Sequence, residues 1–203
     1  MSQKKIIPFI NGENELSSSI VSLADKYSCE GADSLYLYNY TGDEASHEEF
    51  LHTLRAIEKD IDIPFIAGVH VNRFEDAKKA LYTGASRIVM RRAVLPVEKE
   101  LQEITSRFDR DKLAIEIDMQ RDPHTAEQLN QYYDKGFGMI ILKHVDVTEK
   151  LKQASAVHPC RSFGPERDAR YAQIMKAAVA GQQALEEKGI RSVVLREEPF
   201  VHA

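Results

Sequence analysis

The sequence contains little cysteine. Only two of its 203 residues are cysteines, Cys29 and Cys160, and they lie far apart in the chain. Neither has partner histidines at the spacing of a metal site, so the pair supports neither a disulfide framework nor a zinc centre. We therefore interpret both as ordinary reduced cysteines and expect neither a bound metal nor a cofactor.

The sequence also lacks an excess of positive charge and any long apolar run. Its formal net charge is −5, which gives no electrostatic footprint for nucleic acid. No apolar stretch approaches the roughly 20 residues of a membrane-spanning helix. The two lysines before Ile6 resemble the start of a secretory signal, but the apolar part is short and no small-residue cleavage site follows. We expect a cytoplasmic protein that binds neither nucleic acid nor membranes.

Short apolar runs recur along the chain at a regular interval. They are nearly continuous in apolar residues, as expected of parallel strands that are covered on both faces. The predicted strands are Ile6–Ile10, Ser34–Tyr40, Ile63–Ala67, Arg87–Met90, Leu113–Asp118 and Met139–Leu142. The apolar share of 43% suits one globular domain with a sizeable core.

Segments with helical spacing lie between these runs. The apolar residues of Ile20–Tyr27 fall at i, i+3, i+4 and i+7, and comparable stripes begin at Phe50 and at Phe74. Just before the last stripe, Asn72 and Glu75 form a capping-box pattern, which predicts that Asn72 caps this helix. Alternating strands and helices of this kind imply a parallel sheet.

A glycine precedes three of the predicted strands, at Gly31, Gly84 and Gly136. Glycine adopts the left-handed conformation that ends a helix, after which the chain turns directly into the sheet. This recurring junction, together with the regular strand spacing, predicts an α/β fold of the TIM-type (β/α) barrel class.

The pattern weakens after Leu142. A complete barrel has eight strands, whereas the sequence offers six clear ones and a possible seventh in Arg191–Arg196. Val147–Ala156 and Pro165–Lys188 have the character of helices. We expect one barrel-like domain over residues 1–203, incomplete or degenerate in its last two units, with a divergent helical tail from residue 147.

Several stretches resemble a known family. IIPFIN, EGADSLYLYN, IPFIAGVHVNRFEDAKKALYTGASRIVM and LAIEIDMQR are similar to the first five strand units of the histidine-biosynthesis barrels. The closer similarity is to the cyclase subunit of imidazole glycerol phosphate synthase, and a second relative is phosphoribosyl-formimino ribotide isomerase. The chain also looks like the N-terminal barrel part of chains that are fused to phosphoribosyl-AMP cyclohydrolase and phosphoribosyl-ATP pyrophosphohydrolase.

The resemblance implies an active site at the carboxyl ends of the strands, where acids after strands one and five carry out acid/base steps. Here Asn11 replaces the first acid and Asp118 retains the second. Asn39 stands in place of an aspartate after strand two, while Asp146, with His144 nearby, follows strand six. An amide neither gives nor takes a proton near neutral pH, so half of the catalytic pair is missing. For Asp118, capping of the helix after Pro123 is the alternative.

The resemblance implies one phosphate site at a glycine-rich turn after strand three, and a second from strands seven and eight, for which the sequence has no glycine-rich counterpart. Three glycine positions read Gly68-Val69-His70 here, so side chains project where a close backbone approach is needed. Arg91 and Arg92 occupy the matching positions after strand four, and with His70 they could rebuild an anion site. The alternative is that both arginines are solvated loop charges. The loop after strand one, which acts as a lid in the family, is short here.

Two functional hypotheses follow. The first is a histidine-pathway barrel with lost or reduced cyclase activity and a docking or dimerising role, whose partner is a second copy or another pathway domain that covers an exposed sheet edge. The second is an active lyase or isomerase that uses Asp118 and Asp146 on phosphoribosyl intermediates. A ligand-binding or enzymatic barrel unrelated to either remains a third possibility, because barrels host many chemistries.

Overall fold

The computed structural model describes residues 7–13, 15–143 and 193–196. The strands of this part are all parallel and form one sheet in which neighbours in space are neighbours in sequence, from β1 to β7. They are β1 (Phe9–Asn11), β2 (Leu35–Asn39), β3 (Phe65–Val69), β4 (Arg87–Arg91), β5 (Leu113–Asp118), β6 (Met139–Lys143) and β7 (Val193–Arg196).

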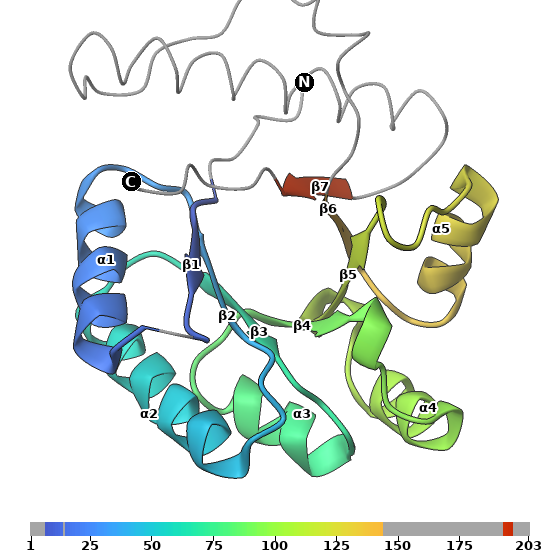
Figure 1. Ribbon diagram of the computed structural model, residues 1–203, viewed down its shortest axis with the longest axis horizontal. Helices are drawn as coiled ribbons and strands as arrows, with labels where there is room; N and C mark the ends of the chain where they lie inside the picture. Colours follow the sequence, from blue (N-terminus) through green and yellow to red (C-terminus); the bar gives the residue numbers. More distant parts are fainter. Residues whose placement is uncertain (1–6, 14, 144–192, 197–203) are drawn as a thin grey trace, which may run out of the picture.

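The sheet curls into an open barrel with the helices on its outer side (Figure 1). The helices are α1 (Ser17–Cys29), α2 (Glu44–Asp60), α3 (Phe74–Leu81), α4 (Glu98–Arg107) and α5 (Ala126–Asp134), with 3-10 turns η1 (Arg92–Val94) and η2 (Arg110–Lys112). The predicted TIM-type, incomplete (β/α) barrel is confirmed, including all six clear strands and the possible seventh. The predicted helices Val147–Ala156 and Pro165–Lys188 lie outside the described residues.

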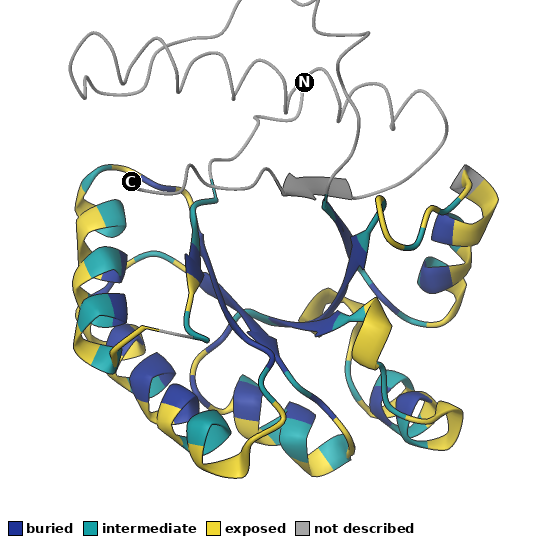
Figure 2. Cartoon of the chain, viewed as in Figure 1, coloured by how far each residue is buried: buried dark blue, intermediate teal, exposed yellow. Residues whose placement is uncertain are grey.

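The main hydrophobic core lies between the sheet and the helices. Alternate strand residues such as Leu35, Leu37 and Ile115 are fully buried against the apolar faces of the helices. Figure 2 shows buried residues along the strands and on the inward sides of the helices, with exposed residues on the helices' outer sides. Because the other face of the sheet is also largely buried, the strands carry apolar residues nearly continuously, which explains why the sequence revealed them.

The three junction glycines adopt the left-handed conformation that the sequence predicts. Their φ angles are +90° at Gly31, +92° at Gly84 and +102° at Gly136. Each lies between a helix and the next strand, where a residue with a Cβ would be strained. This prediction is confirmed.

The predicted cap of α3 is wrong by one residue. The N-cap is Arg73, and the side chain of Asp76, not Glu75, accepts hydrogen bonds at 3.1 Å from the backbone N–H groups of both Asn72 and Arg73. An acid at the third helical position satisfies these free donors as well as Glu75 would have done. The capping principle therefore holds, but the helix begins one residue later than the pattern suggested.

No helix in the described part of the chain is long and apolar enough to cross a membrane.

Gly138, directly before β6, provides a test of how closely the βα units pack. A Cβ at this position would fall on the carbonyl group of Arg110, with the carbonyl carbon 2.8 Å away. Because the obstacle is backbone, Gly138→Ala should lower the free energy of unfolding by about 1–3 kcal/mol in chemical denaturation. The matched control is Gly42→Ala, since no atom lies within 4 Å of that Cβ. Equal stability of the two variants would contradict the packing described.

Candidate functional site

Alternation along the strands divides the sheet into an outer face against the helices and an inner face that lines the barrel. The inner face carries a second hydrophobic cluster, separate from the main core. Its buried members are Tyr36, Tyr38, Tyr40, Ile66, Val89, Ala114 and Ile141. By the same alternation Gly68, Arg91, Glu116 and Asp118 belong to the inner face, so this is where a site inside the barrel would be built.

A buried carboxylate lies at the centre of this inner face. Glu116 of β5 is only 2% exposed, in a strand whose neighbouring residues are apolar. Its Oε2 accepts a hydrogen bond of 2.8 Å from the hydroxyl of Tyr36, and its Oε1 accepts one of 3.2 Å from Nε of Arg91. The Tyr36 hydroxyl lies 2.7 Å from that of Tyr40, so the two share a further hydrogen bond. Both carboxylate oxygens are thus satisfied by protein groups, as burial requires.

Arg91 links this network to the loop after β1. Its guanidinium carbon lies 3.9 Å from the centre of the Tyr40 ring, a cation–π contact. A second carboxylate, that of Glu13, lies 3.8 Å from Nη1 of Arg91 and also accepts a hydrogen bond of 3.2 Å from the backbone N–H of Tyr40. We call Glu13, Tyr36, Tyr40, Arg91 and Glu116 the inner network. The network spans β2, β4, β5 and the short loop after β1.

Gly68 makes room for this network on β3. A Cβ at Gly68 would lie 2.6 Å from the hydroxyl oxygen of Tyr40 and 2.7 Å from Cβ of Tyr38. The absence of a side chain there lets the two rings cross the inner face. The packing of Tyr38 and Tyr40 is thus sufficient to explain why position 68 is a glycine, and no bound ligand is needed to explain it.

Asp118, the predicted catalytic acid, ends β5 on the same face and is partly exposed, at 22% of its side chain. Its Oδ1 accepts hydrogen bonds from the backbone N–H groups of Gln120, at 3.1 Å, and Arg121, at 3.3 Å. Asp118 therefore holds the turn after β5, and it lies in register with Lys143 of β6. The turn precedes Pro123, so Asp118 does not cap α5, whose N-cap is Thr125.

The two asparagines lie apart from each other. Asn11 ends β1, where its Oδ1 accepts a hydrogen bond of 2.9 Å from the backbone N–H of Glu13. Asn39 faces the helices, because its alternate neighbours in β2 belong to the main core. Its Oδ1 accepts bonds from the backbone and side chain of Thr41, at 3.0 and 2.6 Å, and its Nδ2 donates to Ser46 Oγ at 3.1 Å. Asn39 thus stabilises the turn into α2.

The predicted phosphate-binding residues do not form a single group. Arg92 begins η1 and extends to the outside of the barrel, where its Nε lies 3.8 Å from Asp122 Oδ2. His70 follows β3 near His47 of α2, and its Nδ1 has no hydrogen-bond partner among the described residues. Burial is the main cause of a lowered pKa at His47, and the charge of His70 adds to it. His144 and Asp146 lie outside the described residues.

Of the inner network, only Arg91 was predicted as a site residue from the sequence, and neither of the two carboxylates, Glu116 and Glu13, was. The signal for Glu116 was present, because a charged residue in the middle of a buried strand requires a partner. Its partner is Arg91, directly opposite in the register of β4 and β5. Glu13 carried no such signal, since it lies in a loop.

Comparison with known families gives two matches. A family model described as "Histidine biosynthesis protein" matches residues 4–158. A second, described as "Domain of unknown function (DUF3878)", matches residues 141–202, most of which lie outside the described part.

Curated relatives are similar over part of their length. "Imidazole glycerol phosphate synthase subunit HisF" from Nitrosopumilus maritimus is 28% identical over 134 residues, which are 60% of this chain and 50% of the relative. The protein of the same name from Tolumonas auensis is 30% identical over 120 residues, which are 59% and 47% of the two chains. The chain thus spans about half the length of the curated relatives that it matches.

Solved structures resemble the fold at low identity. Dihydropteroate synthase from Thermus thermophilus superimposes with a TM-score of 0.52 at 15% identity, covering 96% of this chain and 89% of that one. The dihydropteroate synthase from Coxiella burnetii, solved with pteroic acid, gives 0.54 at 13%, covering 97% and 89%. These likenesses concern the fold alone.

The inner network predicts that Arg91 is important for stability. Arg91→Met leaves the buried Glu116 without its cationic partner, so the free energy of unfolding should fall by about 2 kcal/mol or more, measured by urea denaturation. Arg121→Met is the matched control, because it removes an exposed arginine 3.7 Å from Asp118 and should cost less than about 1 kcal/mol. If both variants lose the same small amount, the network does not stabilise the barrel as described.

Proposed function

Since the chain belongs to the histidine biosynthesis protein family, we propose that it serves this pathway as an assembly domain and has lost the cyclase activity that its resemblance implies. Its interior is occupied by protein side chains where a pathway ligand would enter. Its contribution is then the binding of a partner, either a second copy of the chain or another domain of the pathway.

The observation that carries this proposal is the ion pair between the partly exposed Arg91 and the buried Glu116. Arg91 is one of the residues that could rebuild an anion site, yet it already faces the carboxylates of Glu116 and Glu13. A phosphate would have to compete with both carboxylates for the guanidinium group. To do so it would have to leave the buried Glu116 without its cation, which is costly.

The acid/base residues support the same conclusion. Asn11 is an amide and its Oδ1 is occupied by the backbone N–H of Glu13, so it cannot take a proton. Asp118 keeps a carboxylate, but two backbone N–H groups of its own turn bind it. Acid/base chemistry of this kind needs two carboxylates on opposite sides of the barrel, and here the one at the position of Asn11 is missing.

The sheet gives the proposed partner a place to bind. Within the described residues, β1 pairs only with β2, and β7 pairs only with β6. An exposed strand edge presents backbone donors and acceptors that native proteins pair or cover. We infer that a partner covers the edge between β1 and β7, and that a second copy of the chain is the first candidate.

Ligand binding tests the loss of activity. We expect calorimetric titration with a bis-phosphorylated ribotide of the pathway to give no heat of binding up to millimolar ligand, with inorganic phosphate as the control for charge. The HisF subunit from Tolumonas auensis, titrated in parallel, shows that the ligand is competent. Micromolar binding to this chain would contradict the proposal.

Sedimentation tests the assembly role independently. At micromolar concentration the purified chain should sediment as a dimer, or should form a complex when mixed with the other purified proteins of the pathway. The reason is that, in the part of the chain that the structure describes, β1 and β7 each pair with one neighbour only. A monomer that binds none of these proteins would overturn the assembly role while leaving the ligand result intact.

A second candidate function is supported by the position of Asp118 at the carboxyl end of β5. The carboxylate of Asp118 is partly exposed, and Asp118 lies opposite Lys143 in the strand register, so two ionisable residues end neighbouring strands there. Under this alternative the protein acts as a lyase or isomerase on phosphoribosyl intermediates. It requires measurable turnover that Asp118→Asn abolishes, while Asp122→Asn, a nearby control, leaves it unchanged.

A further inference from the structure

A surface cavity lies on the outside of the barrel, between the β4–α4 connection and α5. Its volume is about 280 Å³, enough for a small organic molecule. Polar and apolar side chains both line it: Arg92, Ala93, Leu95, Pro96, Glu98, Leu101, Tyr132 and Lys135. The cavity is distinct from the inner network, because Arg91 faces the interior and Arg92, the next residue, leaves the sheet at η1.

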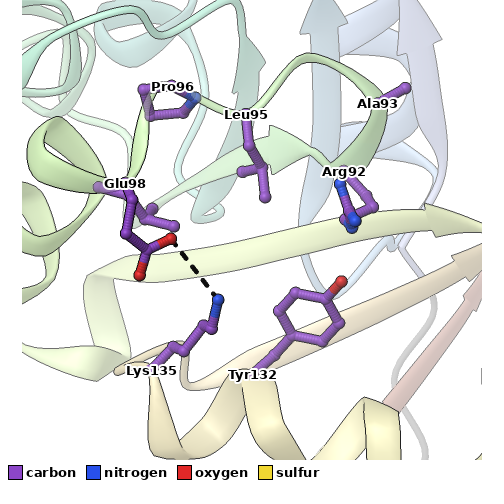
Figure 3. Close-up of a pocket in the computed structure, with 8 residues that line it drawn as sticks. Arg92, Ala93, Leu95, Pro96, Glu98, Tyr132 and Lys135 are labelled. Atoms are coloured by element: carbon purple, nitrogen blue, oxygen red, sulfur yellow. Dashed lines mark ion pairs between the residues drawn. The ribbon is translucent and has the colours of Figure 1, made fainter.

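The charged groups lie at two opposite ends of this cavity. Figure 3 shows Arg92 above the hydroxyl end of Tyr132 on one side, and Lys135 reaching toward Glu98 on the other. The side chain of Leu95 projects between these two ends. The cavity therefore presents one cation at each end and an apolar surface in the middle.

Both cations are only loosely held by protein carboxylates. Nε of Arg92 lies 3.8 Å from Asp122 Oδ2, and Nζ of Lys135 lies 3.7 Å from Glu98 Oε2. Strong hydrogen bonds between such charges are shorter, about 2.7–2.9 Å. All four side chains are also well exposed, a setting in which ion pairs contribute little. A ligand acid with better geometry can displace either carboxylate.

Tyr132 forms the wall of the cavity at the Arg92 end. It is buried, and its hydroxyl lies 3.2 Å from Nε2 of His124. Burial raises its pKa above the ordinary value, although the positive charge of the neighbouring Arg92 acts in the opposite direction. His124 Nδ1 lies 2.8 Å from the backbone carbonyl oxygen of Asp122, which can only accept, so in the neutral imidazole Nε2 accepts the single hydroxyl hydrogen of Tyr132. The neutral hydroxyl is therefore already used as a donor, and Tyr132 contributes the shape of the cavity wall.

The start of α4 adds a further favourable dipole at the Glu98 end. The N-cap residue is Val97, which makes no side-chain capping hydrogen bond. A valine side chain has no hydrogen-bond acceptor, so it cannot cap the first backbone N–H groups of α4. The positive end of the helix dipole favours an anion there.

The geometry points to a binding site for a short organic anion that carries an acidic group at each end, such as a dicarboxylate. One acidic group binds Arg92, and the other replaces Glu98 on Lys135. The chain between them packs on Leu95 and Leu101. A ligand with a single acidic group occupies only one end and binds more weakly.

Succinate, the simplest dicarboxylate, serves as the probe, with propionate as its single-acid counterpart, and binding is followed by calorimetry and by NMR shifts. Succinate should bind and propionate should bind at least about tenfold more weakly, because one charge-assisted contact is lost. Arg92→Gln and Lys135→Gln should each weaken succinate binding by a similar factor.

Glu98→Gln provides the sharpest test. Removal of the competing carboxylate should strengthen succinate binding several-fold, an outcome that a purely structural role of Glu98 does not produce. Lys99→Gln and Glu127→Gln make the same charge changes on exposed residues of α4 and α5 that do not line the cavity, and they should leave binding unchanged. Succinate that fails to bind at tens of millimolar, or that binds equally to the lining and control variants, overturns the assignment. So does propionate that binds as tightly as succinate.

Discussion

A carboxylate buried inside a barrel must be neutralised, and much of the inner face of this protein is organised around that requirement. Glu116 accepts hydrogen bonds from the hydroxyl of Tyr36 on β2 and from the guanidinium of Arg91 on β4. Arg91 in turn forms an ion pair with Glu13 of the loop after β1. Each partner restricts the next one: the ring of Tyr40 supports the guanidinium, and Gly68 leaves space for the ring. The polar groups form a connected set in which each satisfies another, which is the condition under which buried polar networks are tolerated.

The resemblance to an enzyme family thus suggests an active site, whereas the contacts inside this barrel suggest that its inner residues stabilise the fold. The strands, the junction glycines and the short turns reproduce the scaffold, whereas the residues that face inward are bound to one another. Fold and function separate readily in barrels, because the scaffold depends on the outer face of the sheet and chemistry depends on the rim. The function of an arginine at the end of a barrel strand can therefore be judged only when its other contacts are known. Here Arg91 has two carboxylate neighbours inside the barrel, and Arg92 lies outside it.

The sequence predicted the scaffold well, because the signals for it are local. Continuous apolar runs marked the strands, and glycines marked the left-handed turns such as Gly136. The site was harder to predict from the sequence, because it depends on which residues lie opposite each other in neighbouring strands. Nothing local shows that Asn39 turns toward the helices or that Glu116 is opposite Arg91 in the register. Even the cap of α3 moved by one residue, since Asp76 and Glu75 are chemically equivalent at a helix start.

The sequential order of the strands has a consequence for how the chain folds. Each strand pairs with the next one along the sequence, so most of the sheet can grow by adding one unit at a time, with only short loops to close. The hydrogen bond from Tyr36 to Glu116 is different, because it joins residues 80 positions apart. The entropy lost in closing the loop between Tyr36 and Glu116 opposes this contact until the intervening strands have formed. The inner network is accordingly expected to form late, after β2 to β5 have assembled, and to act as the step that fixes the curvature of the sheet.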